Sequence, residues 1–197
     1  MKREFLAQFV SLALGPLTFL VLMPLIIVYR QTGNLGYALT WELFSLFFIT
    51  VGVALLFIGR GQGVFSDFDL SIKAERQKFY HRVLILALIY FIATALIKGL
   101  FFHLTVVIFS TLLIIVAFTV ANNFIKASIH LGIVCAFVFS MGLFFGPYVF
   151  IWLFFLIPLM AWSRFKLKKH TLKEMLTGGL LGTAITLFSF FSWKFLI

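Results

Sequence analysis

The stretch Ala127–Ser163, ASIHLGIVCAFVFSMGLFFGPYVFIWLFFLIPLMAWS, runs for 37 residues without a lysine, arginine, aspartate or glutamate. A helix needs about 20 apolar residues to cross a bilayer, so this run is too long for one crossing. Gly146-Pro147 lies near its middle, and proline breaks a helix because it lacks the N–H and clashes with the preceding turn. The stretch therefore predicts two membrane-spanning helices joined by a sharp turn.

The composition of the 197-residue chain leads to the same class of protein. Hydrophobic residues make up 63% of it and charged residues 11%, against about 45–50% and about 25% in soluble domains. These values exclude a disordered chain, a coiled coil and a water-soluble globule. The apolar runs are continuous rather than alternating, which favours helices over a strand barrel.

We therefore predict an all-α protein, a polytopic transmembrane helical bundle of about seven spans that forms a single integral-membrane domain over residues 1–197. The first span is expected to bend at Pro16 and Pro24. The spans are placed near residues 9–29, 41–59, 82–98, 101–122, 129–145, 148–163 and 175–195.

The net charge of +10 is distributed unevenly across these spans. Seven crossings put the N-terminus and the loops after the second, fourth and sixth spans on one side of the membrane. That side carries Lys2, Arg3, Arg60, Lys73, Arg76, Lys78, Arg82, Lys126, Arg164, Lys166, Lys168, Lys169 and Lys173, and the other carries Arg30, Lys98 and Lys194. Because cytoplasmic loops are enriched in lysine and arginine, we expect the first side to be cytoplasmic, in the cell membrane of a prokaryote.

Three polar clusters lie on that same side: Ser66–Arg76, Lys126–His130 and Ser163–Glu174. Each is separated from the next by an even number of spans, so all three can contribute to one site. Within the first cluster, Asp67 and Asp69 are expected to cap a helix or pair with local bases. Beyond the third cluster, Gly178, Gly179 and Gly182 are expected to allow a close approach between helices.

The third cluster has the spacing of a catalytic site. His170 and Glu174 are four residues apart, so on a helix they would share a face. A carboxylate there can accept the Nδ1–H of the imidazole and leave Nε2 to attack. Arg164 can bind phosphoryl oxygens with its planar fork, and His130 offers a second imidazole. Two histidines, cations and one carboxylate suit phosphoryl transfer, in which one histidine attacks phosphorus and the other protonates the departing oxygen.

These residues also resemble a known pattern. Ser163-Arg164-x5-His170-x3-Glu174 is similar to the third signature of the type 2 phosphatidic acid phosphatase superfamily, S-R-x5-H-x3-D, and Ala127-Ser128-Ile129-His130 is similar to its second, P-S-G-H. The first signature, K-x6-R-P, is not matched, although Lys73 and Arg76 hold its place in chain order. The resemblance covers roughly residues 66–182 and leaves the first two spans outside.

The resemblance implies a membrane phosphatase with a core like that of this superfamily, a phosphoric monoester or diphosphate hydrolase. Its substrate would be a lipid phosphate or isoprenoid diphosphate in the bilayer, with no metal, no other cofactor and no nucleic acid. By position, His170 would form a phosphohistidine, Glu174 would orient it and His130 would be the general acid. The phosphate would be held by Arg164, Ser128, Lys73, Arg76 and the neighbouring Lys126.

Three departures from the family pattern keep alternatives open. Glutamate replaces aspartate at 174, Ile129 replaces a glycine that would let the backbone approach phosphate, and the first signature is altered. A catalytically degenerate relative with a lipid-binding or scaffold role is one alternative. A Mg-dependent membrane prenyltransferase, suggested by Ser66-Asp67-Phe68-Asp69, is another. Such enzymes need two separate acidic motifs, whereas all carboxylates but Glu4, Glu42 and Glu174 lie in this one region.

Overall fold

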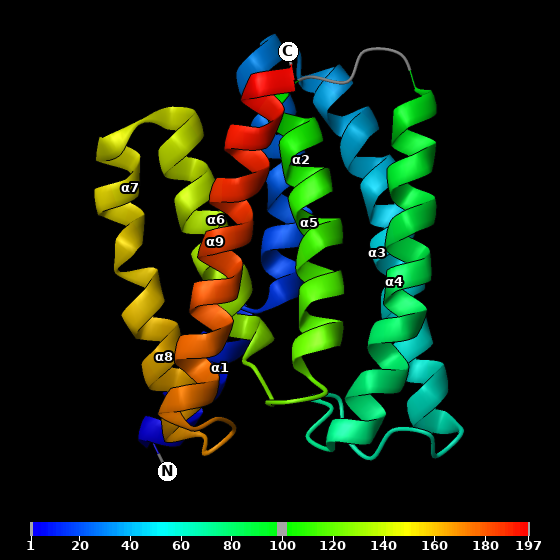
Figure 1. Cartoon of the computed structure of the whole chain (residues 1–197), viewed down its shortest axis with the longest axis vertical. Helices are drawn as coiled ribbons and strands as arrows, with labels where there is room; N and C mark the ends of the chain where they lie inside the picture. The colour runs from blue at the N-terminus through cyan, green and yellow to red at the C-terminus, as the bar shows by residue number, and fades with distance from the viewer. Residues whose placement is uncertain (1, 98–101, 197) are drawn as a thin grey trace. The chain divides into compact units, whose positions relative to one another are not determined.

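The computed structural model describes residues 2–97 and 102–196, and every regular element in these ranges is an α-helix. Lys98, and the predicted boundaries at residues 98 and 101, lie outside the described residues. The helices are α1 (Lys2–Ala13), α2 (Pro16–Thr32), α3 (Leu35–Gly61), α4 (Lys73–Leu96), α5 (Phe102–Ala121), α6 (Ile129–Phe145), α7 (Pro147–Phe154), α8 (Leu156–Lys166) and α9 (Leu172–Leu196) (Figure 1). The all-α prediction is confirmed for this part of the chain.

Five segments are long and apolar enough to cross a membrane: Leu35–Gly61, Lys73–Leu96, His103–Ala121, Pro147–Lys166 and Leu172–Ser192. The pair α1 and α2 makes a sixth if the two helices, bent by 40°, are counted as one span. Large apolar side chains remain exposed along these segments, among them Phe47, Ile89 and Trp152. Such exposure is costly in water and expected against lipid, so the chain has the helices of an integral membrane protein.

Glycine and proline set the breaks between helices. The bend in the first apolar run falls between Ala13 and Pro16, whereas Pro24 lies inside α2 and does not end it. The predicted turn at Gly146-Pro147 is confirmed, because α6 ends at Phe145, Gly146 has a φ of 99° and Pro147 is the first residue of α7. A φ in this region favours glycine, and proline suits the first turn of a helix.

The predicted span 148–163 consists of two helices. α7 ends at Phe154 and α8 begins at Leu156, so a single residue interrupts the helix. Pro158 explains the position of the break, since it has no N–H to donate to the carbonyl four residues earlier, at Phe154.

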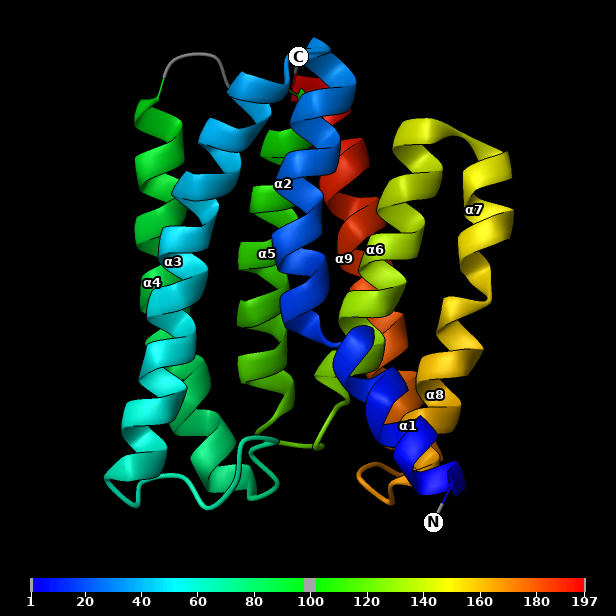
Figure 2. The same ribbon diagram turned by 180° about the vertical axis from the view of Figure 1, so that it is seen from behind.

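The chain divides into two compact units: unit 1 is Met1–Phe19 with Ile125–Ile197, and unit 2 is Leu20–Phe124. In unit 1, α6 is the central helix and packs against α9, α7 and α8, while α1 packs against α8 (Figure 2). The starts of α1, α6 and α9 and the end of α8 lie at the same end of this unit (Figure 1). In unit 2, α4 packs against both α3 and α5. The expectation of one integral-membrane domain stays a prediction.

Candidate functional site

The third motif runs from the end of α8 through a short loop, which contains His170, into the first turn of α9. α8 ends with paired backbone hydrogen bonds, from Lys168 N–H to the Phe165 carbonyl (3.0 Å) and from Lys169 N–H to the Arg164 carbonyl (3.1 Å). This is the pattern of a Schellman motif, whose residue after the cap adopts a left-handed conformation. Lys168 occupies that position with a φ of 53°. The tight turn brings the chain directly from Arg164 to His170.

α9 begins with a reciprocal cap between Thr171 and Glu174. The backbone N–H of Thr171 donates to Oε2 of Glu174 (2.9 Å), and the backbone N–H of Glu174 donates to Oγ1 of Thr171 (3.3 Å). This is a capping box, which satisfies two N–H groups at a helix start. The capping box requires a side chain that reaches back to the first residue, and glutamate at 174 provides it.

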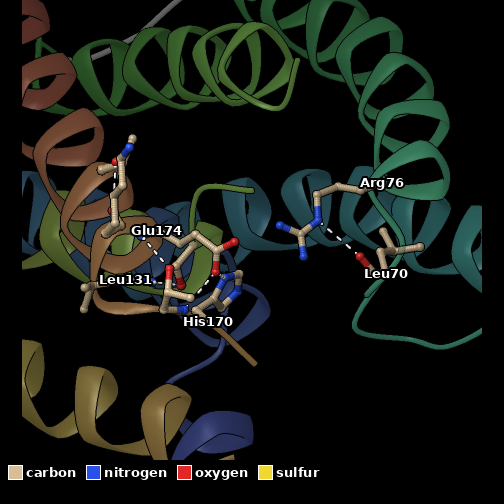
Figure 3. A network of polar contacts seen from close by, with 9 residues as sticks. Leu70, Arg76, Leu131, His170 and Glu174 are labelled. Carbon is tan, nitrogen blue, oxygen red and sulfur yellow. Dashed lines mark hydrogen bonds and ion pairs between the residues drawn. The ribbon is translucent and has the colours of Figure 1, made fainter. Parts of the chain in front are cut away.

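His170 lies just before this cap, so it is not part of α9. The expectation that His170 and Glu174 share a helix face is therefore wrong, because the helix begins only after Thr171. The two side chains still meet: Nδ1 of His170 is 3.4 Å from Oε2 of Glu174 (Figure 3). The histidine side chain is 1% exposed and that of Glu174 is 19% exposed. One carboxylate oxygen thus faces both the ring and the Thr171 N–H.

The second motif contacts the third through the backbone. Ser128 is the N-cap of α6, and its Oγ accepts the N–H of Leu131 at 3.5 Å. Its own N–H donates to the carbonyl of Glu174 (3.0 Å), and the residue is fully buried. His130 follows in the first turn of α6 and is half-buried. The structure therefore brings together Ser128, Glu174 and His170.

Two glycines of α9 allow this contact. A methyl group on Gly178 would overlap the backbone of Ser128, and one on Gly182 would overlap the backbone of Gly132. A methyl group on Gly179 would only touch the Cys135 sulfur, at 3.4 Å. The close-approach expectation is confirmed for Gly178 and Gly182, which form the crossing point of α6 and α9.

Arg164 is held by the N-terminal helix. Its side chain is buried, and Nη1 donates to Oγ of Ser11 in α1 (2.7 Å). The preceding residue, Ser163, donates from Oγ to the Ala7 carbonyl of the same helix (2.6 Å). Sequence reasoning missed Ser11 because it precedes Arg164 by 153 residues and α1 lies outside the family resemblance.

An open hollow of about 600 Å³ borders this loop. Its lining comes from the end of α8, the loop that follows and the start of α9, and consists of Phe165, Lys166, Lys168, Lys169, His170, Thr171, Leu172 and Glu174. Three lysines at such a hollow favour an anionic occupant.

The capping-box spacing Thr171-x2-Glu174 was a signal in the sequence that could have identified Thr171 as part of this site.

The residues at the place of the first signature belong to unit 2. Lys73 donates from Nζ to the Asn123 carbonyl (2.7 Å), just beyond α5, and Arg76 donates from Nε to the Leu70 carbonyl (3.2 Å) (Figure 3). Asn122 adds bonds from Nδ2 to the Lys73 carbonyl (3.1 Å) and to Gln77 Oε1 (2.9 Å). The bonds of Lys73 and Asn122 fix the start of α4 against the end of α5, and the bond of Arg76 fixes it to the loop before α4.

Lys126 belongs to unit 1. It is the central residue of a tight turn in which Ala127 N–H donates to the Ile125 carbonyl (2.8 Å), the three-residue pattern of a γ-turn. This turn leads directly into the cap of α6 at Ser128.

Asp67 of the loop before α4 and Glu75 in the first turn of α4 both accept hydrogen bonds from residues of this loop. Asp67 accepts the N–H of Ser71 (3.3 Å), and Oε2 of Glu75 accepts both the N–H (2.7 Å) and the Oγ (2.9 Å) of Ser66. Asp67 therefore stabilises the loop itself and does not cap α4, whose N-cap residue is Ile72 and has no side-chain cap bond. Over residues 2–97 and 102–196, no three His, Cys, Asp or Glu side chains are grouped so that they could hold a metal ion.

The sequence matches no protein-family model, and comparison with curated proteins and with solved structures finds no match. The family resemblance therefore depends on the motif residues themselves.

Proposed function

We propose that the protein is an integral-membrane phosphohydrolase that removes phosphate from a lipid phosphate or an isoprenoid diphosphate through a phosphohistidine at His170. One arrangement carries the proposal: Oε2 of Glu174, in the first turn of α9, lies 3.4 Å from Nδ1 of His170, and the Glu174 carbonyl accepts the backbone N–H of Ser128 in the second motif. A carboxylate that faces Nδ1 selects the tautomer in which Nε2 carries a lone pair, which is what a nucleophilic imidazole needs.

The proposed reaction has two steps. In the first, Nε2 of His170 attacks phosphorus, the bond to the leaving oxygen breaks, and His130 protonates that oxygen. In the second, His130 takes a proton from water, the water oxygen attacks the phosphohistidine, and the P–N bond breaks to release phosphate and restore the ring. Positive and polar groups would stabilise the negative charge on phosphate; the candidates in unit 1 are Arg164, Ser128 and Lys126.

The proposal includes a membrane arrangement of seven crossings. α1 and α2 would together form one crossing, and α6, a 17-residue apolar helix, would form another beside the five long segments. The motif loops would face the cytoplasm of a prokaryotic cell. The support for this side is the excess of lysine and arginine in these loops.

The test is phosphate release by the detergent-solubilised protein supplied with phosphatidate or a polyprenyl diphosphate. We expect turnover by the wild type, its loss in His170→Ala, and a phosphorylated His170 in wild-type protein quenched during turnover and analysed by mass spectrometry. His81→Ala is the matched control, because His81 lies on an exposed part of α4 with Nδ1 at the Gln77 carbonyl (2.8 Å). Undiminished turnover in His170→Ala would exclude the proposed nucleophile.

A second candidate is binding of a lipid phosphate without turnover. Burial of the His170 and Ser128 side chains favours this candidate, because a buried group is poorly placed to attack a phosphate. The His170 side chain is 1% exposed, and Ser128 is fully buried with its Oγ at the cap of α6. Phosphatidate in nanodiscs would then bind to the protein, with no phosphate released and no phosphohistidine formed.

A further inference from the structure

The contact between α1 and α8 includes two hydrogen bonds that lie one helical turn apart on α1. Consecutive residues of α8, Ser163 and Arg164, bond to Ala7 and Ser11, which are four apart on α1. All four residues are buried, and Figure 2 shows α1 alongside α8 in this unit. Residues four apart share a helix face, so α1 presents one face to both members of the Ser163-Arg164 pair.

The two bonds differ in what they can do. Ser163 donates to a backbone carbonyl and so fastens one helix to the other. Oγ of Ser11 instead accepts a hydrogen bond from Nη1 of Arg164 at 2.7 Å. A guanidinium is a rigid plane with five N–H donors. Fixing one Nη therefore restricts the direction in which the remaining donors point, and the hydroxyl of Ser11 does this without adding a charge that would compete with an anion.

We propose that Ser11 is a positioning residue, which holds the Arg164 guanidinium in the orientation that binds the substrate phosphate. This inference rests on the proposed function, in which Arg164 is a phosphate ligand. It makes the N-terminal helix part of the phosphate-binding machinery. Two planar hydrogen bonds to a phosphate need the fork at a defined angle, so loss of the Ser11 contact weakens phosphate binding even where the fold is kept.

The experiment compares three variants of the full-length protein in detergent with the wild type. Ser11→Ala and the near-isosteric Ser11→Cys remove the hydroxyl, and Ser11→Thr keeps it. We expect the first two to raise the KM for phosphatidate and the Ki of inorganic phosphate by about tenfold, the size expected for one hydrogen bond to a charged group, with a smaller change in kcat. Ser11→Thr restores both constants to within about twofold of the wild type.

Ser163→Ala is the matched control, because it removes an equally buried hydrogen bond from the same helix pair. It lowers the thermal stability and leaves KM and Ki unchanged. If Ser163→Ala and Ser11→Ala raise KM equally, α1 acts only through its docking and the inference is overturned. If the wild type turns over and Ser11→Ala and Ser11→Cys match it, the inference alone is overturned. A wild type that neither releases phosphate nor binds it overturns the proposed function, and this inference with it.

Discussion

Ser128 and Glu174 are joined through their backbones, with the Ser128 N–H donating to the Glu174 carbonyl at 3.0 Å. Neither side chain takes part in this bond, so the second and third motifs stay in contact when either side chain is replaced. Variants at Glu174 therefore test the chemistry of the carboxylate and its role in the capping box, and they leave the backbone contact between the two motifs intact.

Glu174→Gln separates the two roles of the carboxylate. Glutamine also closes a capping box, so we expect the free energy of unfolding to change by less than about 0.5 kcal/mol. The negative charge that faces Nδ1 of His170 is lost, and we expect phosphate release to fall by about 10²–10⁴-fold, the usual contribution of such a group. Thermal unfolding in detergent and a phosphate-release assay measure the two effects. Full activity in this variant would leave Glu174 as a cap only.

Thr171→Ala removes the other half of the capping box. The Glu174 N–H, which donates to Oγ1 of Thr171 at 3.3 Å, loses its acceptor, and loss of an N-cap side chain costs about 1 kcal/mol. Thr171→Ser keeps the oxygen and serves as the control, with stability close to the wild type. Equal melting temperatures for the alanine and serine variants would contradict the cap.

Where a local rule applies, the sequence predicted the structure. Gly146-Pro147 ends α6 because both residues act on the backbone beside them, and the small residues at 178 and 182 permit a close crossing because nothing but size is needed there. The interruption at Phe155 was not predicted, although the same kind of rule, applied to Pro158, accounts for it.

The parts that were not predicted depend on contacts between distant segments or on where a helix begins. His170 and Glu174 have helical spacing, but α9 begins only after its N-cap residue Thr171. Their contact therefore joins a histidine of the loop to a glutamate in the first turn of the helix, and the two do not share a helix face. The bond between Ser11 and Arg164 joins residues 153 apart, and no local pattern around Ser11 distinguishes it from other small residues in an apolar helix.

The glycines of α9 are expected to differ sharply in their tolerance of alanine. Gly178→Ala and Gly182→Ala place a methyl group against the backbone of α6, and overpacking of this kind costs about 1–3 kcal/mol or more. Gly179→Ala meets only ordinary contact at the Cys135 sulfur and gains helix propensity of up to about 1 kcal/mol. Melting temperatures and size-exclusion profiles in detergent report the difference. An unfolded Gly179→Ala beside a stable Gly182→Ala would reverse the assigned crossing point.

Lys168 is a site where a substitution should stabilise the protein. Its φ of 53° lies in the left-handed region, which costs a residue with a Cβ roughly 1 kcal/mol and imposes no steric cost on glycine. Lys168→Gly is therefore expected to raise the free energy of unfolding by up to about 1 kcal/mol, since the Schellman bonds of Lys168 and Lys169 are made by the backbone and remain. Lys166→Gly removes a like charge two residues earlier, but within α8, where glycine costs about 1 kcal/mol relative to a good helix former. Opposite shifts of the two melting temperatures are expected, whereas a parallel rise would assign the effect to the loss of positive charge around the hollow.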